Sequence, residues 1–260
     1  MYDFLNAISP IEFIDDIYLK RNDKLSIFNL NGGKVQGAYY LIQKAMQNGY
    51  NNVVSLGSRF SPQCYIISNI CENIGINCHL FIPFSKCDTN LIKIIEKNSN
   101  TNIYRIKYGY TSNLIYNAKK FSKLNNYYFI PFGMKCYDNI DIISKQVSNI
   151  PKNIKRIIVP VGSGNTFLGI LKGLNDYNRI EIKLIGIYTG SDASKYIYAN
   201  IPIMNKIKFE LKYYKSELTP SKRYEKIVNN YIGNIKLNER YEGKCFEFLE
   251  KNDLLWIVGS

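Results

Sequence analysis

The chain has 260 residues, 46% of them hydrophobic, so it is long enough to bury one large or two modest cores and is not disordered. Its 34 Lys and Arg against 21 Asp and Glu give a formal charge of +13, which favours anionic partners, nucleic acid above all. The preferred alternative is a compositional bias toward lysine, because the lysines are scattered over most of the chain and would lie on solvated faces. The sequence has neither a long apolar run nor the basic flank and apolar centre of a secretion signal, so we expect no membrane association and a cytoplasmic location.

Cysteine and histidine chemistry is not indicated. The six cysteines form no CxxC pair, and His79 is the only histidine that could join them as a metal ligand. We therefore expect reduced thiols, no metal site and no Ser-His-Asp system. The chemistry must come from lysine, serine, tyrosine and carboxylates, or from a cofactor.

The first half of the chain alternates short strands with helices. Strands are expected at 16–20, 52–56, 78–83, 103–107 and 127–132, and helices at 38–46, 63–73, 91–97 and 114–124. This alternation predicts parallel strands joined by crossover helices.

The same pattern then restarts. Helices are expected at 140–147, from about 166 to 174, at 221–231 and at 242–251, and strands at 156–161, 183–188 and 254–258. The sequence thus predicts an α/β fold with two open, twisted, mostly parallel sheets and helices on both faces. We assign residues 1–50 and 133–260 to a large domain and 51–132 to a small one, with the active site in the cleft between them.

Two glycine-rich turns are candidate ligand sites. Gly32-Gly33-Lys34 stands between a strand and a helix, where the backbone can turn sharply and an imine-forming lysine could sit. Gly162-Ser163-Gly164-Asn165-Thr166 follows a hydrophobic strand and opens a helix, so free N–H groups and hydroxyls converge where phosphate binds. The alternatives are a solvated lysine and a tight turn with Thr166 as a helix cap.

Two further segments add polar groups. Gly57-Ser58-Arg59-Phe60-Ser61-Pro62-Gln63 again joins a strand to a helix, at the edge where open α/β sheets bind ligands. A capping role for Ser61, with Pro62 at the first helical position, is the competing interpretation. Tyr241-Glu242-Gly243-Lys244 places a phenol beside a carboxylate.

Together these segments resemble those of one family. Lys20-Arg21-Asn22-Asp23 and the four segments above occur in the order seen in fold type II (tryptophan synthase β-like) pyridoxal-phosphate (PLP) enzymes. The similarity is greatest to the 1-aminocyclopropane-1-carboxylate (ACC) deaminase and D-cysteine desulfhydrase branch, and it spans about Ile17 to Ser260.

The resemblance implies roles for single residues. It makes Lys34 the Schiff-base lysine and residues 162 to 166 the phosphate-binding loop, and it places Glu242 opposite the pyridine nitrogen of PLP. Ser61 and Tyr241 would be catalytic, and the substrate-binding residues would be Ser58, Arg59, Ser61 and Gln63. The implied activity is deamination, elimination or decarboxylation of an amino-acid amine through a Schiff base and a quinonoid carbanion. A homodimer is also implied.

The sequence departs from the family at two positions. Gly33 replaces the usual asparagine before the lysine, and Pro62 replaces the usual asparagine after the serine. One alternative is therefore a non-catalytic binding protein with the same fold. Another is a viral enzyme, working in the host cytoplasm on an amino-acid-modified base in DNA, for which the basic and aromatic segment Lys206 to Lys226 would supply a binding surface. A third is a nucleotide-binding α/β protein unrelated to PLP.

Overall fold

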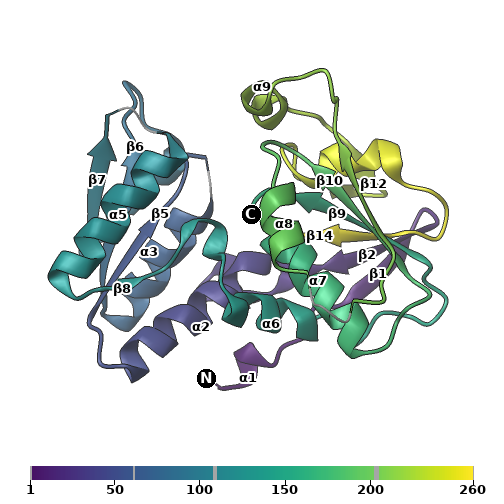
Figure 1. The fold of residues 1–260 in the computed structure, drawn as a ribbon, viewed down its shortest axis with the longest axis horizontal. Helices are drawn as coiled ribbons and strands as arrows, with labels where there is room; N and C mark the ends of the chain where they lie inside the picture. Colours follow the sequence, from purple (N-terminus) through teal and green to yellow (C-terminus); the bar gives the residue numbers. More distant parts are fainter. Residues whose placement is uncertain (1, 61, 108–109, 202–204, 260) are drawn as a thin grey trace. The chain divides into compact units, whose positions relative to one another are not determined.

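The computed structural model describes residues 2–60, 62–107, 110–201 and 205–259. It divides into two compact units, each built on its own sheet of parallel or mostly parallel strands (Figure 1). The large unit comprises residues 1–25, 31–33 and 137–260, and the small unit comprises residues 26–30 and 34–136. No helix within the described residues is both long and apolar enough to cross a membrane.

The large unit is organised around a six-stranded sheet with the order β1-β2-β14-β9-β10-β11. β1 pairs antiparallel with β2, and all other neighbouring strands are parallel. Its strands are β1 (Ile11–Ile14), β2 (Ile17–Arg21), β9 (Arg156–Val161), β10 (Lys183–Tyr188), β11 (Phe209–Tyr213) and β14 (Leu254–Ile257). β9 and β10 are buried on both faces, as central parallel strands are. The predicted mostly parallel sheet is confirmed.

Each face of this sheet is covered by different elements. α6 (Tyr137–Lys145), α7 (Asn165–Asp176) and α8 (Ser194–Ala199) pack on one face. α7 approaches α6 closely, because a Cβ at Gly173 would lie 2.4 Å from the Ser144 carbonyl oxygen. The other face carries the 3-10 helix η3 (Glu242–Phe248) and the hairpin of β12 (Tyr231–Ile232) and β13 (Ile235–Lys236). The remaining short elements of the large unit are α1 (Tyr2–Leu5), η1 (Asn22–Lys24) and α9 (Pro220–Glu225).

The small unit contains a four-stranded sheet with the order β7-β6-β5-β8, and every pair in it is parallel. Its strands are β5 (Asn52–Leu56), β6 (Asn77–Pro83), β7 (Thr101–Ile106) and β8 (Tyr128–Phe129), and its helices are α2 (Gly33–Gln47), α3 (Pro62–Ile74), α4 (Asn90–Ile95), α5 (Thr111–Asn125) and the 3-10 helix η2 (Phe132–Met134). The hairpin of β3 (Ser26–Ile27) and β4 (Leu30–Asn31) links the two units along the chain.

α5 and α3 lie on opposite faces of the small sheet. Leu114 and Ala118 of α5 pack in one cluster with Val54 of β5. Ser55, the next residue of the strand, points to the other face and accepts a hydrogen bond from Gln63 of α3 at 3.1 Å. The fold therefore has helices on both faces of each sheet, as the sequence predicted.

The boundaries of the two units along the chain differ from those predicted. Residues 26–30, 34–50 and 133–136, which we expected in the large domain, belong to the small unit. α2 passes into β5 through only four residues, and Tyr39 of α2 makes an edge-on ring contact with Phe28 of the small unit at 6.2 Å. A helix so closely joined to a strand packs with that strand's sheet.

Two local predictions were wrong, and two strands were missed. The expected helix at 242–251 is a 3-10 helix that ends at Phe248, and the N–H groups of Lys244 and Leu249 bond the carbonyl oxygens three residues earlier. The expected helix at 221–231 ends at Glu225. β1 and β11 were not predicted, although Phe209–Tyr213 alternates apolar and polar residues as a half-buried strand does.

Candidate active site

The Gly162 to Thr166 loop joins β9 to α7, as the sequence predicted. Gly164 adopts a left-handed conformation with a φ of 90°, and a Cβ there would lie 2.9 Å from Ile197 Cγ1. A Cβ at Gly162 would meet no atom within 4 Å, so the space beside this glycine is open. The first amides of α7 have no acceptors within the helix. The loop is thus an open backbone turn at the positive end of a helix dipole.

Asn165 provides a donor at the same place. Its side chain is 1% exposed, and its Oδ1 accepts a hydrogen bond from the Tyr196 hydroxyl at 2.9 Å. Its Nδ2 is buried and has no hydrogen-bond partner among the described residues. A buried donor without a partner costs about 1 to 3 kcal/mol, so an oxygen-bearing ligand beside it would be stabilised.

Glu242 is a second buried group with an unmet hydrogen bond. It is fully buried at the start of η3, and its Oε1 accepts backbone N–H groups from Val258 at 2.6 Å and Gly259 at 3.2 Å. Its Oε2 has no partner among the described residues. Burial raises the pKa of this carboxyl group to about 7, against the opposing effect of the backbone hydrogen bonds. One oxygen is held rigidly while the other can receive a donor.

A short series of hydrogen bonds connects Glu242 to the residue before Lys34. Val258 donates its N–H to Glu242, and its carbonyl oxygen accepts the N–H of Gly33 at 2.7 Å. A Cβ at Gly33 would lie only 3.0 Å from that carbonyl oxygen, so a glycine allows this close approach. Lys34 is the next residue and lies in the first turn of α2.

Tyr241 is paired with a residue that the sequence did not single out for this site. The hydroxyl oxygens of Tyr241 and Tyr224 lie 3.2 Å apart. Burial, and then the neighbouring Tyr224, raise the pKa of Tyr241 well above its usual value. Tyr241 is therefore a neutral phenol that can donate or accept a hydrogen bond. Tyr224 belongs to the aromatic and basic segment 206–226, but its pairing with Tyr241 follows only from the fold.

Lys244 of the Tyr-Glu-Gly-Lys segment has a structural position that the sequence did not reveal. Its side chain is fully buried, and its Nζ donates to the carbonyl oxygens of Thr189, Arg223 and Tyr224 at 3.2, 2.6 and 3.1 Å. Burial lowers the pKa of Lys244 to about 8. This lysine fixes the segment that carries Tyr224.

The proposed substrate residues lie at the carboxyl end of β5 in the small unit. Arg59 donates to the Ser85 hydroxyl at 2.5 Å, and its guanidinium lies 4.8 Å from the Phe60 ring centroid. Gln63 is buried and donates to the Pro131 carbonyl oxygen as well as to the Ser55 hydroxyl, which braces the loop. Ser58 is half-buried at the start of this loop, and Ser61 lies outside the described residues. The substrate roles of these residues stay predictions.

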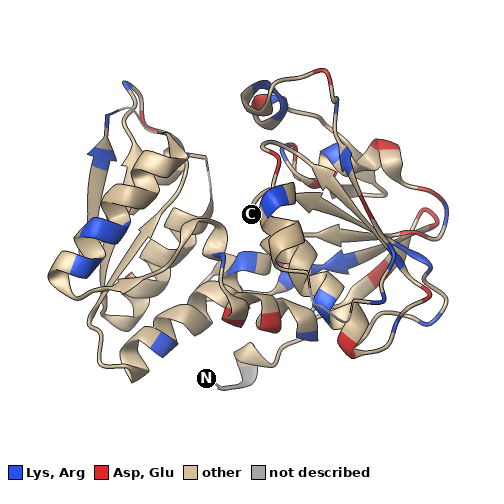
Figure 2. Cartoon of the chain, viewed as in Figure 1, with Lys and Arg blue, Asp and Glu red and all other residues tan. Residues whose placement is uncertain are grey.

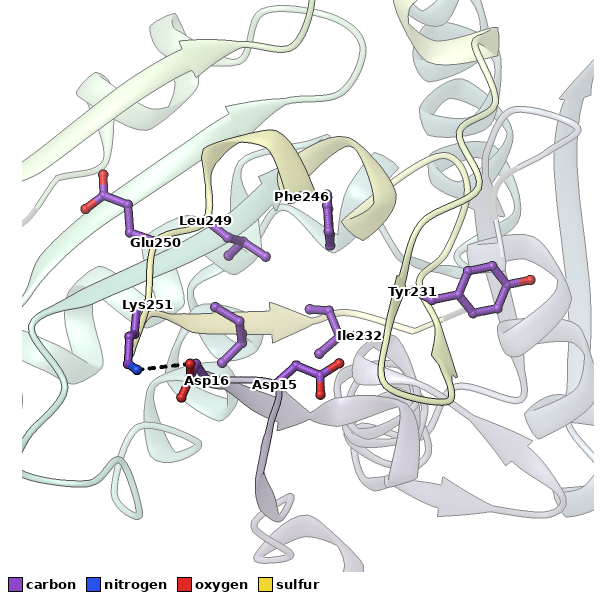
Figure 3. A pocket seen from close by; sticks show the side chains of 9 residues that line it. Asp15, Asp16, Tyr231, Ile232, Phe246, Leu249, Glu250 and Lys251 are labelled. Carbon is purple, nitrogen blue, oxygen red and sulfur yellow. Dashed lines mark ion pairs between the residues drawn. The ribbon is translucent and has the colours of Figure 1, made fainter.

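A separate hollow in the large unit contains none of the predicted site residues. It has a volume of about 380 Å³ and is lined by Asp15, Asp16, Ile17, Tyr231, Ile232, Phe246, Leu249, Glu250 and Lys251 (Figure 3). Asp15 accepts the N–H of Gly233 at 2.7 Å, and Asp16 pairs with Lys251 at 3.1 Å. Both carboxylates are thus used within the fold. In the described part of the chain, no group of three or more His, Cys, Asp or Glu side chains could hold a metal ion.

The groups of the large unit match the two ends of PLP. The phosphate needs backbone and side-chain donors, which the loop at 162–166 and Asn165 Nδ2 would provide. The protonated pyridine nitrogen needs a buried acceptor, which Glu242 Oε2 would provide. Both unmet hydrogen bonds have the polarity that this cofactor requires.

Comparison with known proteins identifies the family. A family model described as "Pyridoxal-phosphate dependent enzyme" matches residues 5–229. An O-seryl-dTMP PLP-dependent decarboxylase of Salmonella phage ViI is 22% identical over 350 aligned residues, covering 99% of this chain and 82% of its own. A putative ACC deaminase of Pyrococcus abyssi is 22% identical over 191 residues, covering 69% of this chain and 57% of its own. The crystal structure of an ACC deaminase homologue superposes with a TM-score of 0.81 and 20% identity, covering 97% of this chain and 89% of its own. The chain therefore belongs to the family of pyridoxal-phosphate dependent enzymes.

Proposed function

We propose that this protein breaks a bond at the α-carbon of an amino-acid substrate, as a deaminase, lyase or decarboxylase. The observation that carries the proposal is Glu242, whose buried Oε2 lacks a donor while its Oε1 is fixed by two backbone amides. PLP supplies an electron-accepting ring, which becomes a stronger acceptor when its nitrogen stays protonated. Glu242 is the carboxylate of this chain that would keep the ring nitrogen protonated.

The other residues bind the cofactor or move protons. Lys34 would hold the cofactor covalently and, with a substrate bound, would take and return protons at the substrate carbon. The loop at 162–166 and Asn165 bind the phosphate. Tyr241, held by Tyr224, orients the substrate or exchanges a proton with it, and Ser61 is proposed as a second catalytic residue. Arg59 suits an anionic or larger substrate.

The covalent link to Lys34 can be tested without a substrate. The purified protein should show a PLP absorbance band near the edge of the visible range. Borohydride reduction should then fix the pyridoxyl group on Lys34, where peptide mass spectrometry can locate it. Lys34→Ala should abolish both signals, and Lys44→Ala, on the same helix, should leave them unchanged. A band that survives Lys34→Ala, or a pyridoxyl group on another lysine, would contradict the assignment.

A second candidate places the amino-acid group on a nucleotide in DNA. It is favoured by the phage relative, which acts on an O-seryl nucleotide and aligns with 99% of this chain, and by the formal charge of +13. The test compares free amino acids with the same amino acids linked to a pyrimidine in duplex DNA, measuring release of ammonia and carbon dioxide. Turnover of the DNA-linked form alone would support this candidate, whereas turnover of free amino acids alone would refute it.

Two other properties stay open to direct measurement. We propose a homodimer, which light scattering of the purified protein would detect. Bound cofactor without turnover of any amino acid or modified nucleotide would instead favour the non-catalytic alternative that Gly33 and Pro62 suggest.

A further inference from the structure

Most of the net charge belongs to the small unit. Its residues include twelve Lys and Arg but only three Asp and Glu, which gives +9 of the total +13. The stretch from Lys97 to Cys136 contains seven Lys and Arg and no acidic residue at all. This stretch forms strands β7 and β8 of the small sheet and helix α5, which packs on one face of that sheet. The positive charge is therefore not spread evenly over the molecule.

The three acidic residues of the small unit are engaged elsewhere. Asp88 and Glu96 both pair with Arg105, at 2.9 and 2.5 Å. Glu72 accepts hydrogen bonds from the Ser99 hydroxyl and the Asn100 amide, at 2.8 and 2.9 Å. No carboxylate of this unit remains to neutralise the lysines of α5. Figure 2 accordingly shows the basic residues of α5, all lysines, without any acidic residue on this helix.

The solvent side of α5 combines these lysines with an aromatic ring. We define the basic face of α5 as Tyr116, Lys119, Lys120 and Lys123, which are all exposed and follow helical spacing. Tyr116 is 62% exposed, and Lys120 Nζ lies 6.0 Å from the centroid of its ring. Within the described residues, no ion pair involves any of the three lysines. Each charge is thus available to an external anion.

The segment 206–226, which the sequence favoured as a basic surface, is different in the structure. Arg223 is buried and donates to the carbonyl oxygens of Gly190 and Leu218, both at 2.7 Å. Lys212 and Lys215 pair with acidic side chains, at 3.4 and 3.5 Å. Three of the seven cations of this segment are therefore used within the fold.

We propose that the basic face of α5 binds the phosphate backbone of duplex DNA, an inference that rests on the second proposed candidate function. Duplex DNA carries one negative charge per about 1.7 Å of axis, and the three lysines span about 6 Å along α5. Such a row of cations contacts several phosphates without reading sequence. Tyr116 adds an amphipathic side chain beside them.

The topology of the small unit connects this face to the substrate loop. Its four strands are parallel, so their carboxyl ends share one edge of the sheet. Residues 57–63 follow β5 at that edge, and α5 begins at the same edge after β7. From the start of α5 the lysines lie about 12 to 18 Å along the axis, the rise of about four to five base pairs. DNA held along α5 can thus reach the substrate loop.

The test measures binding of unmodified DNA by the intact protein. Fluorescence anisotropy with a labelled duplex, between 50 and 200 mM salt (about the range where phosphate contacts dominate), gives the affinity and its salt dependence. The variant Lys119→Gln/Lys120→Gln/Lys123→Gln should lower the slope of log K against log salt by about 2 to 3 and the affinity at least about tenfold. The matched control, Lys206→Gln/Lys222→Gln/Lys226→Gln, removes the same charge from exposed sites of the large unit. Its affinity and its salt slope should stay within about twofold of the wild-type values.

Several results would overturn the proposal. They are unchanged binding by the α5 variant, equal losses in both variants, or a wild-type protein that binds only single strands or anionic lipid vesicles. Thermal melting of both variants verifies that the fold is intact. The cofactor band, recorded without DNA on the same samples, tests the proposed function separately from DNA binding by α5. If the band is absent while DNA binding depends on α5, the proposed function fails alone. If it is present and α5 has no effect, this inference fails alone.

Discussion

Replacing Glu242 by glutamine should change how the stability of the cofactor-free protein depends on pH. Burial raises the pKa of Glu242 to about 7 in the folded protein, from an unperturbed 4.5. The folded state then binds more protons than the unfolded state between these two values. Stability from this group is therefore fully present below about pH 4.5 and is lost as pH rises through 7. A shift of this size corresponds to about 3 kcal/mol.

The single tryptophan makes this contribution measurable. Trp256 is fully buried in β14 of the large unit, two residues before Val258, so its fluorescence reports unfolding around Glu242. Urea titrations of wild type and Glu242→Gln at several pH values give two stability profiles. Their difference isolates Glu242, because other groups titrate equally in both proteins. Lys20, for example, is buried with a pKa lowered to about 7, and it adds stability only as pH rises above that value.

The expected outcome is that the wild type loses about 3 kcal/mol more than Glu242→Gln between pH 4.5 and 8. Parallel profiles for the two proteins would refute the reasoning, because they would show that Glu242 is not desolvated. Added PLP should reduce the wild-type loss, since a protonated ring nitrogen stabilises the charged carboxylate. It should have less effect on the variant.

Three further predictions concern the same unit. Gly164→Ala should cost about 1 to 3 kcal/mol in urea unfolding and weaken PLP binding in an absorbance titration, because the new Cβ would crowd Ile197 in a left-handed conformation. Lys244→Met should cost at least about 2 kcal/mol in the same unfolding assay, because three buried carbonyl oxygens lose their donor. Tyr224→Phe should leave PLP binding intact and lower kcat about twofold to tenfold in a steady-state assay, since Tyr241 loses one neutral hydrogen bond. Native stability for the first two variants, or unaltered kcat for the third, would contradict these expectations.

Local pattern was enough to predict most strands and the turns between strand and helix. β5, β9 and β10 have the predicted bounds, because buried parallel strands are apolar on both faces and give continuous apolar runs. The position of the 162–166 loop followed from the same boundary. The short strands β1 and β11 escaped detection, since they pair at or near the sheet edge and carry charged residues.

The electrostatic properties of the site could not be predicted in this way. The burial of Glu242 and the choice of which of its oxygens is satisfied depend on Val258 and Gly259, which lie 16 and 17 residues further along the chain. Lys244 and Arg223 are similar cases, because each binds carbonyl oxygens brought together only by the fold. These contacts join residues that lie far apart in the sequence, so a window of ten residues does not include both partners. The burial of Lys244 and Arg223 is therefore visible only in the fold.

The structure explains one departure from the family pattern, the glycine before Lys34. An asparagine, which the family usually carries, would place a Cβ 3.0 Å from the Val258 carbonyl oxygen and 3.3 Å from Asn22 Cβ. With glycine, the backbone N–H reaches that oxygen at 2.7 Å, and the same peptide of Val258 donates to Glu242. Gly33 therefore couples the chain just before Lys34 to the buried carboxylate through main-chain groups alone. This connection does not depend on the rotamer of a side chain at position 33, because it runs through planar peptide groups. The substitution that first suggested a lost function is thus compatible with a rigidly held lysine backbone.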